Sequence, residues 1–185
     1  MDDDKIIKLY LAKSEKAIAE TDAKYGKLCR YIAMNILHNS EDSEECVNDV
    51  YHAVWNAIPP KKPEKFSAFI GKITRNLALK KYEFITAAKR NPEVQVSLSE
   101  LDECVSGHDY IETELENRRI ERAISDFLRQ QSTEKRTVFI RRYWYIDSIS
   151  CISKQLGISE SKVTSMLFQT RRKLREFLES EDIKI

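Results

Sequence analysis

The side chains of this sequence that could act on a partner are mostly basic and gathered in two segments. Residues 61–90 contain nine Lys and Arg against two Glu, and residues 134–175 contain ten Lys and Arg against three Asp and Glu. Each segment therefore carries a charge of +7, although the formal net charge of the chain is only +1. Clustered lysine and arginine side chains neutralise phosphates, so both segments are candidates for binding nucleic acid.

Acidic residues are segregated as well. Residues 91–116 contain eight Asp and Glu and no Lys or Arg, and residues 41–49 contain five acids and no base. The near-neutral net charge of the chain is thus the sum of strongly basic and strongly acidic segments. Enzymatic patterns are missing, since the sequence has no phosphate-binding glycine loop, no G-x-S-x-G, no C-x-x-C pair and no histidines at metal-ligand spacing. We expect a protein without catalytic activity, metal or cofactor.

The composition predicts an all-α fold. Only four glycines and four prolines occur among 185 residues, whereas 33% of the residues are charged and 42% are hydrophobic. Apolar periodicity predicts helices over Asp2–Glu20, Thr21–Leu37, Ser40–Ile58 and Glu64–Lys89, with Ser40 as the cap of the third. No apolar run reaches the ~20 residues that span a bilayer, and the start MDDDKIIKLY is too acidic for a secretory signal, so we expect a cytoplasmic protein that does not insert into membranes.

The helical periodicity fades after Asn91, where acids accumulate. We therefore predict two small helical domains, 1–90 and 116–185, joined by an extended acidic linker over 91–115. In the second domain a short helix with Ile149, Ile152 and Leu156 is followed by a glycine and a long basic helix. This order is typical of a helix-turn-helix, with Ser159 as the cap of the long helix.

The long helix has an apolar face and a polar face. We expect the apolar face to pack in the domain and the polar face to enter the major groove of DNA, with arginines on the phosphates. The candidate contacts are Lys162, Thr164, Ser165, Phe168, Gln169, Arg171 and Arg172. The alternative is a solvated basic helix face, but the glycine turn directly upstream favours binding.

The first basic segment lacks this arrangement. Two lysines lie in a proline-bounded loop and the other candidates project from a helix, a mixture suited to holding a backbone and reading a few bases. These candidates are Lys61, Lys62, Arg75, Asn76, Lys80 and Lys81. A solvated lysine face is the alternative.

The acidic helix over residues 41–58 precedes this basic segment. Its first acids stabilise the helix N-terminus, but Asn48 and Asp49 lie further in and off the apolar stripe, where they could face a basic protein partner.

Two stretches carry a family resemblance. YGKLCRYIAMNILHNSEDSEECVNDVYHAVWNAI with FIGKITRNLALKKY resembles the second conserved region of bacterial extracytoplasmic-function (ECF) sigma factors of the sigma-70 family. EKRTVFIRRYWYIDSISCISKQLGISESKVTSMLFQTRRKLREFL resembles their fourth region. The two motifs occur in the order of the family, with an acidic segment between them.

The resemblance implies a function for each part. The helix over residues 41–58 would dock on a coiled coil of the largest subunit of core RNA polymerase, which makes Asp42, Glu45, Asn48 and Asp49 candidate contacts. The first basic segment would engage the minus-ten element of promoter DNA, and the helix after Ser159 would read the minus-thirty-five element. The flap region of the polymerase and an anti-sigma protein are further partners that the family implies, and the free protein is expected to be a monomer.

The match has departures. Many relatives carry Arg or Lys where this chain has Thr164, and Arg where it has Met166 and Gln169. The loss of a bidentate guanine contact, worth about 1–3 kcal/mol, changes which bases are preferred. The competing interpretations are a stand-alone helix-turn-helix regulator that binds duplex DNA without polymerase, usually as a dimer, and a helical adaptor that binds only proteins. The adaptor leaves both basic segments unexplained.

Overall fold

The structure, a computed structural model, describes residues 1–85, 92–105 and 114–183. The described residues form helices joined by turns and contain no strand, so the predicted all-α fold is confirmed. The chain divides into two compact units, Met1–Asn91 and Pro92–Ile185. In the described part, no helix is both long and apolar enough to cross a lipid bilayer.

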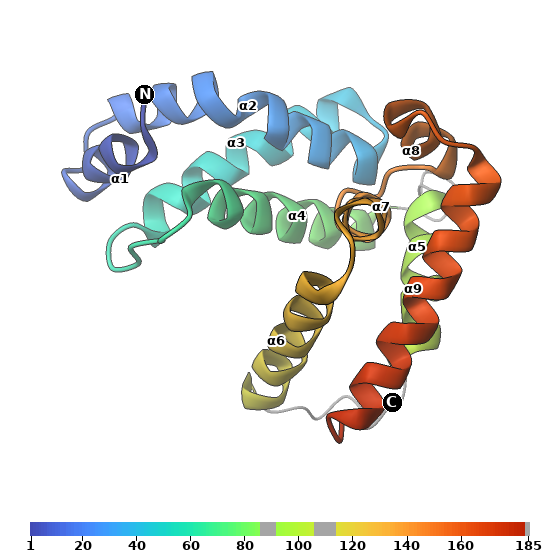
Figure 1. The fold of residues 1–185 in the computed structure, drawn as a ribbon. Coiled ribbons are helices and arrows are strands. Elements are labelled where there is room, and N and C mark those ends of the chain that lie inside the picture. The colour runs from blue at the N-terminus through green and yellow to red at the C-terminus, as the bar shows by residue number, and fades with distance from the viewer. Residues whose placement is uncertain (86–91, 106–113, 184–185) are drawn as a thin grey trace. The chain divides into compact units, whose positions relative to one another are not determined.

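The first unit contains the helices α1 (Asp3–Leu11), α2 (Lys16–Leu37), α3 (Ser40–Ala57) and α4 (Phe66–Phe84). Helices α2, α3 and α4 pack pairwise against one another, and α1 covers α2 and α4 at one end (Figure 1). The apolar stripes run along the contacting faces because residues three and four apart share one side of a helix. Their fully buried members include Ile6, Cys29, Ile32, Ile36, Val50, Val54 and Ile70.

Aromatic rings close the end of this core. Phe66, the first residue of α4, is fully buried, and its ring centroid lies 5.9 Å from that of Tyr10 and 5.6 Å from that of Tyr25. The Tyr10 hydroxyl is buried with it and hydrogen-bonds to the Thr21 hydroxyl at 2.9 Å. Helix α4 therefore begins at a fixed point on α1 and α2. The buried stripe of α4 ends before Phe84, whose side chain is 80% exposed.

Two boundaries differ from the sequence prediction. The first break falls after Leu11 rather than after Glu20, because α2 already begins at Lys16 and the Thr21 hydroxyl donates back to the Ala17 carbonyl at 2.7 Å, which satisfies it inside a helix. The cap of α3 is Asn39 rather than Ser40. Its side chain accepts a hydrogen bond from the Asp42 amide at 2.9 Å.

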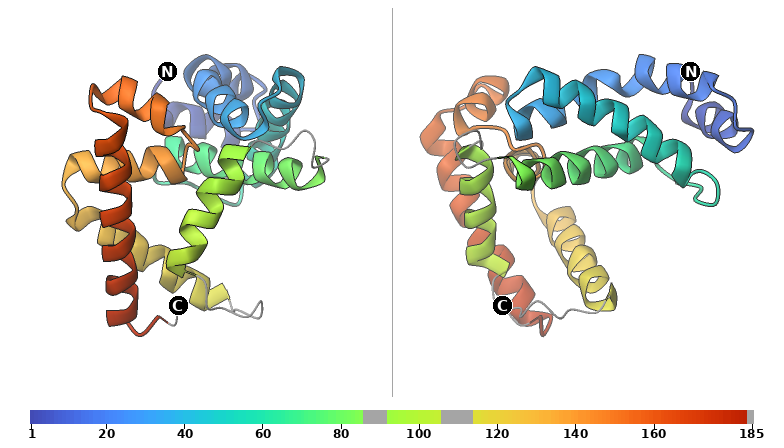
Figure 2. Two further views of the ribbon diagram at one scale, coloured as in Figure 1. Left: turned by 90° about the vertical axis from the view of Figure 1, so that its right-hand side faces the viewer. Right: turned by 180° about the vertical axis from the view of Figure 1, so that it is seen from behind.

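The second unit contains α5 (Pro92–Val105), α6 (Glu114–Gln130), α7 (Thr133–Tyr143), α8 (Ile149–Leu156) and α9 (Glu160–Ser180). The other four helices all contact α9, and α5 runs alongside it (Figures 1 and 2). The core that they enclose is apolar and includes Phe127, Val138, Phe139, Ile152, Val163, Leu167, Leu174 and Leu178. Helix α9 is thus the central element of this unit.

Helix α5 corrects the prediction of an extended linker over residues 91–115. Residues 92–105 are helical and pack on α7 and α9, so they belong to the second unit. Pro92 is suited to the first helical position and Glu93 to the first turn, where its charge complements the helix dipole. The remaining part of the predicted linker, 106–113, lies outside the described residues.

Gly157 offers a test of the turn between α8 and α9. It caps α8 with φ +65°, a conformation that costs L-residues about 1 kcal/mol or more, and no atom lies within 4 Å of a Cβ built there. We expect Gly157→Ala to lower the free energy of unfolding by about 1 kcal/mol through backbone strain alone. Urea denaturation of the full chain measures this change.

Gly71→Ala is the matched control. Gly71 is buried inside α4, and an added Cβ would meet only Ile32 Cδ1 at 3.9 Å, an ordinary contact. This substitution should instead stabilise the protein by about 0.5–1 kcal/mol, because alanine favours helix interiors. Equal effects of the two substitutions would contradict the left-handed conformation at Gly157.

Candidate nucleic-acid interface

Helices α8 and α9 are joined by a short, tightly bonded turn. The left-handed Gly157 ends α8, and Ser159 begins α9 by accepting a hydrogen bond from the Lys162 amide at 3.2 Å. The Ser153 hydroxyl donates to the Ile158 carbonyl at 2.6 Å and ties the turn to α8. A helix of 8 residues followed by a glycine turn and a helix of 21 residues has the order of a helix-turn-helix.

The two faces of α9 separate as their residue types predicted. Val163, Leu167, Leu174 and Leu178 are buried against the other helices. The opposite face is exposed in its first turns, with the Phe168 side chain 59% exposed although it is aromatic. The exposed candidates for DNA contact are Lys162, Thr164, Ser165, Phe168, Gln169 and Arg172.

Some of these side chains already have partners. The Lys162 ammonium pairs with Glu134 at 2.7 Å, and the Thr164 hydroxyl donates to the Glu160 carbonyl at 3.0 Å. Arg172 pairs with Glu176 one turn later at 3.5 Å, with both side chains more than half exposed. Such exposed pairs are worth little, typically about 0–1 kcal/mol, so they oppose an incoming phosphate only weakly.

Arg171 differs from the other candidates because it is partly buried. Its Nη1 lies 3.2 Å from Oε2 of Glu100 on α5 and 2.7 Å from the Tyr143 hydroxyl on α7. The Tyr143 hydroxyl in turn donates to Glu100 at 2.8 Å. The side chain predicted to bind a DNA phosphate is therefore held, in the free chain, by a carboxylate of the same unit.

Next to Arg171 lies Arg142, which the sequence did not single out. Its side chain is 1% exposed, and its Nη1 pairs with Glu93 at 2.6 Å and donates to the Asp147 carbonyl at 3.2 Å. Its Nη2 lies 3.4 Å from Glu100. Burial lowers the pKa of Arg142, but the hydrogen bonds to Glu93 and Glu100 outweigh burial and raise the pKa above its ordinary value.

In the first unit most of the basic candidates are exposed. Lys61 and Lys62 lie in the loop before α4, and Asn76 and Lys80 project outward from α4. Arg75 is half-buried on the same helix, and burial lowers the pKa of its guanidinium. The exposed positions come from a loop and a neighbouring helix, the mixture that the sequence predicted.

Lys81 joins two sites that the sequence treated as separate. Its ammonium lies 2.5 Å from Glu45 and 3.0 Å from Asp42, both predicted polymerase contacts on α3. Burial lowers the pKa of Lys81, but hydrogen bonds to these two carboxylates outweigh it and raise the pKa. This pairing links α3 to α4, so Lys81, Asp42 and Glu45 have a structural role whether or not they also bind partners.

Asn48 and Asp49 are exposed on α3, as predicted from their place off the apolar stripe. Asn48 lines a groove of about 900 Å³ between α2 and α3. The groove also contains Tyr51, whose hydroxyl donates to Asp22 at 2.7 Å, and Arg30, which pairs with Asp22 at 3.2 Å. The sequence did not predict this groove, because nothing in the periodicity tells which residues of α2 lie opposite Asn48.

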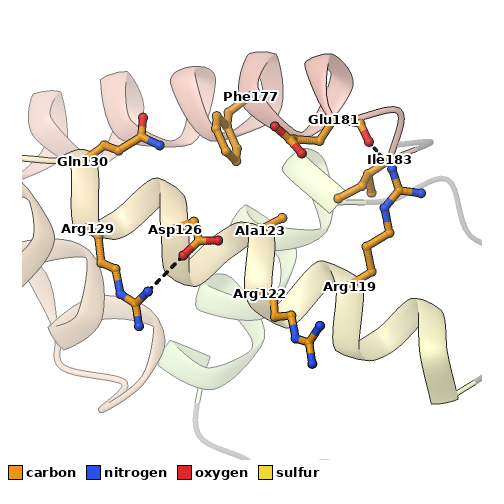
Figure 3. Close-up of a pocket in the computed structure, with 9 residues that line it drawn as sticks. All are labelled: Arg119, Arg122, Ala123, Asp126, Arg129, Gln130, Phe177, Glu181 and Ile183. Atoms are coloured by element: carbon orange, nitrogen blue, oxygen red, sulfur yellow. Dashed lines mark hydrogen bonds and ion pairs between the residues drawn. The ribbon is translucent and has the colours of Figure 1, made fainter.

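A second groove, of about 690 Å³, lies between α6 and the end of α9 (Figure 3). Three arginines from α6 line it, together with the apolar side chains of Phe177 and Ile183. Arg129 pairs with Asp126 at 3.1 Å, and Arg119 donates to the Glu181 carbonyl. This groove follows the turns of α9 that carry the candidate DNA contacts and is not part of that surface. Among the described residues, no group of His, Cys, Asp and Glu is arranged to hold a metal ion.

Comparison with known families identifies the first unit. Residues 23–84 match the family model for sigma-70 region 2, a span that runs from the first turns of α2 to the end of α4. The first unit therefore contains a sigma-70 region 2, the region that the sequence resemblance placed there.

Other comparisons are more distant. No curated protein matches the chain. A solved structure, that of CnrH in complex with the cytosolic domain of CnrY, is 19% identical and aligns over 95% of this chain and 96% of that chain, with a TM-score of 0.43. At this similarity the match adds nothing to the assignment, which depends on region 2.

The charged cluster around Arg142 can be tested by its effect on stability. Arg142→Gln removes the positive charge that Glu93 and Glu100 share, and we expect it to lower the free energy of unfolding by roughly 2–3 kcal/mol. Arg129→Gln is the control, since the Arg129 side chain is 77% exposed and its ion pair should contribute less than about 0.5 kcal/mol. Chemical denaturation of both variants compares them, and similar losses would show that Arg142 does not hold the unit together.

Proposed function

We propose that this protein is a sigma factor of the ECF type, which binds core RNA polymerase and directs transcription initiation to particular promoters. The observation that carries this proposal is the sigma-70 region 2 match in a chain whose other unit presents an exposed polar helix after a glycine turn. The protein would have no catalytic activity of its own. Its action would be to bring the polymerase and the promoter together.

The polymerase would contact the first unit on α3. Asn48 and Asp49 are exposed there beside the α2–α3 groove, and an acidic, hydrogen-bonding surface suits a basic partner. The proposed partner element is the coiled coil of the largest subunit, with the flap region as a second contact. Asp42 and Glu45 would contribute at the edge of this surface, while they also hold Lys81.

Promoter DNA would contact both units. The loop lysines and the exposed face of α4 would hold the minus-ten element, where a separated strand needs phosphate contacts and a few base contacts. The first turns of α9 would enter the major groove at the minus-thirty-five element, with Ser165, Phe168 and Gln169 at base edges and Arg172 on a phosphate. Two weak DNA contacts on one chain reinforce each other through effective concentration.

The direct test is reconstitution of initiation. Purified protein, core polymerase and a fluorescent fork-junction DNA should form a stable ternary complex, and promoter-directed RNA should appear with nucleotides. Tight binding to duplex DNA without polymerase, together with dimer formation, would favour the stand-alone regulator instead. An anti-sigma partner stays a prediction of the resemblance.

Asp49→Lys tests the polymerase surface. Reversal of this exposed charge should weaken binding to core polymerase at least tenfold, because a like charge then faces a basic partner. The melting temperature should stay close to that of the unmodified protein, since Asp49 is exposed and outside the core. Asp4→Lys makes the same charge change on the exposed side of α1 and should leave polymerase affinity unchanged. Normal binding by the Asp49 variant would rule out α3 as the docking helix.

Arg172→Gln tests the DNA-reading helix. Loss of one phosphate contact should weaken duplex binding to a similar degree for all sequences and reduce the slope of log affinity against log salt by about one. Arg129→Gln removes one positive charge from α6 and should leave this slope unchanged. Fluorescence anisotropy titrations at several salt concentrations measure both, and an unaltered slope in the Arg172 variant would mean that this face does not meet the phosphates.

A further inference from the structure

Helix α5 presents an acidic face to the basic surface of the second unit. We define this face by Glu93, Ser97 and Glu100, which lie four and three residues apart and therefore on one side of the helix. Glu100 pairs with Arg171 at 3.2 Å and accepts from Tyr143 at 2.8 Å. Arg171 is thus occupied by a carboxylate at the place where DNA binding would require a phosphate.

The acidic face is attached at a second point two turns earlier. Glu93 pairs with Arg142 at 2.6 Å, and Glu100 reaches the same guanidinium at 3.4 Å. Arg142 is 1% exposed and Arg171 is partly exposed, so α5 contacts one buried and one accessible cation. Only Arg171 belongs to the candidate DNA surface.

Between these two attachments the docked face contains an unsatisfied group. The Oγ atom of Ser97 is buried and has no hydrogen-bond partner among the described residues. A buried hydroxyl without a partner destabilises the docked state relative to a state in which water can reach it. The docked position of α5 is held by its charges together with Val94, which is fully buried, and Leu101, which packs on the core, and it is opposed by Ser97.

Charge distribution supports the same conclusion. The segment 91–116, which contains α5, carries −8, and the segment 134–175, which contains α7 and most of α9, carries +7. A carboxylate and a phosphate make the same kind of charge-assisted hydrogen bond to a guanidinium. Glu100 and a DNA phosphate are consequently alternative ligands of Arg171.

We propose that α5 is an intrachain competitor of DNA, whose acidic face covers Arg171 in the free chain and has to release it before α9 binds a phosphate there. This inference rests on the proposed function, because it takes α9 as the DNA-reading helix. The free chain would then bind DNA more weakly than the exposed face of α9 alone allows. Binding of DNA would weaken the docking of α5, and docking of α5 would weaken the binding of DNA by the same factor.

The experiment uses the full chain and two readouts. Hydrogen exchange of the amides in residues 92–105 reports whether α5 is docked, and fluorescence anisotropy with a labelled duplex reports DNA affinity. Glu100→Gln should speed exchange in α5 and tighten duplex binding about three- to tenfold, because the competing charge is lost. Addition of duplex to the unmodified protein should also speed exchange in α5.

Ser97→Ala is the opposing variant. It removes the unsatisfied hydroxyl without touching an ion pair, so it should slow exchange in α5 and weaken duplex binding about two- to fivefold. Glu179→Gln is the matched control for charge, since it neutralises one carboxylate that, within the described ranges, pairs with Arg175 of its own helix at 3.2 Å. It should leave exchange in α5 unchanged and tighten duplex binding by less than twofold.

Two results would overturn the inference and leave the proposed function intact. One is equal tightening by Glu100→Gln and Glu179→Gln, which would be a general effect of charge. The other is faster exchange in α5 with unchanged duplex affinity. If no variant binds duplex DNA, with α5 docked or released and with or without core polymerase, then α9 is not a DNA-reading helix and the proposed function fails together with the inference.

Discussion

The second unit depends on the burial of one guanidinium. Arginine does not give up its charge at any accessible pH, so a side chain that is 1% exposed has to be surrounded by acceptors. Arg142 finds them in Glu93 and Glu100 of α5 and in the carbonyl of Asp147 after α7. Three segments are thereby fixed around one charge, and the loop that leads into α8 is among them. The placement of the segment that leads into α8 follows from this constraint.

The helices of the first unit could be predicted from periodicity because each buries an apolar stripe that is visible in the sequence. Val50 and Val54 on α3, and Ile32 and Ile36 on α2, are fully buried as expected. Helix α5 was missed although Val94 is fully buried and Leu101 packs on the core. Its acids also make long-range contacts to α7, with Glu100 bonding to residues 42 and 43 positions later, and a sequence does not show that an acid will find its partner at that distance. An acidic stretch near a proline was therefore interpreted as a linker.

In the candidate site, too, some features could be predicted from the sequence and others could not. Exposure of Ser165, Phe168, Gln169 and Arg172 was predictable, since these positions are what remains when the apolar stripe of α9 is assigned to the core. Pairing was not predictable. Lys81 was expected among DNA contacts, yet it lies 2.5 Å from Glu45, because α3 and α4 pack with those side chains opposed. The residue type predicts which groups a side chain can bind. Which group it contacts in the free chain depends on how the helices pack, and this the sequence does not show.

The net charge of the chain is near zero because oppositely charged segments cancel, and helix packing brings some of these opposite charges into direct contact. Opposite charges in this chain do not merely average over the surface, because Glu100 meets Arg171, and Asp42 and Glu45 meet Lys81, in direct contact. Direct pairs reduce the attraction of each unit for nucleic acid in general, since a single phosphate gains little by replacing a carboxylate that is already in place. A ligand that contacts many side chains at once can still displace them, because its contacts to exposed side chains offset the small cost of each exchange. If α9 reads DNA as proposed, a surface built in this way would discriminate against isolated phosphates and in favour of a partner that fits the whole exposed face of α9.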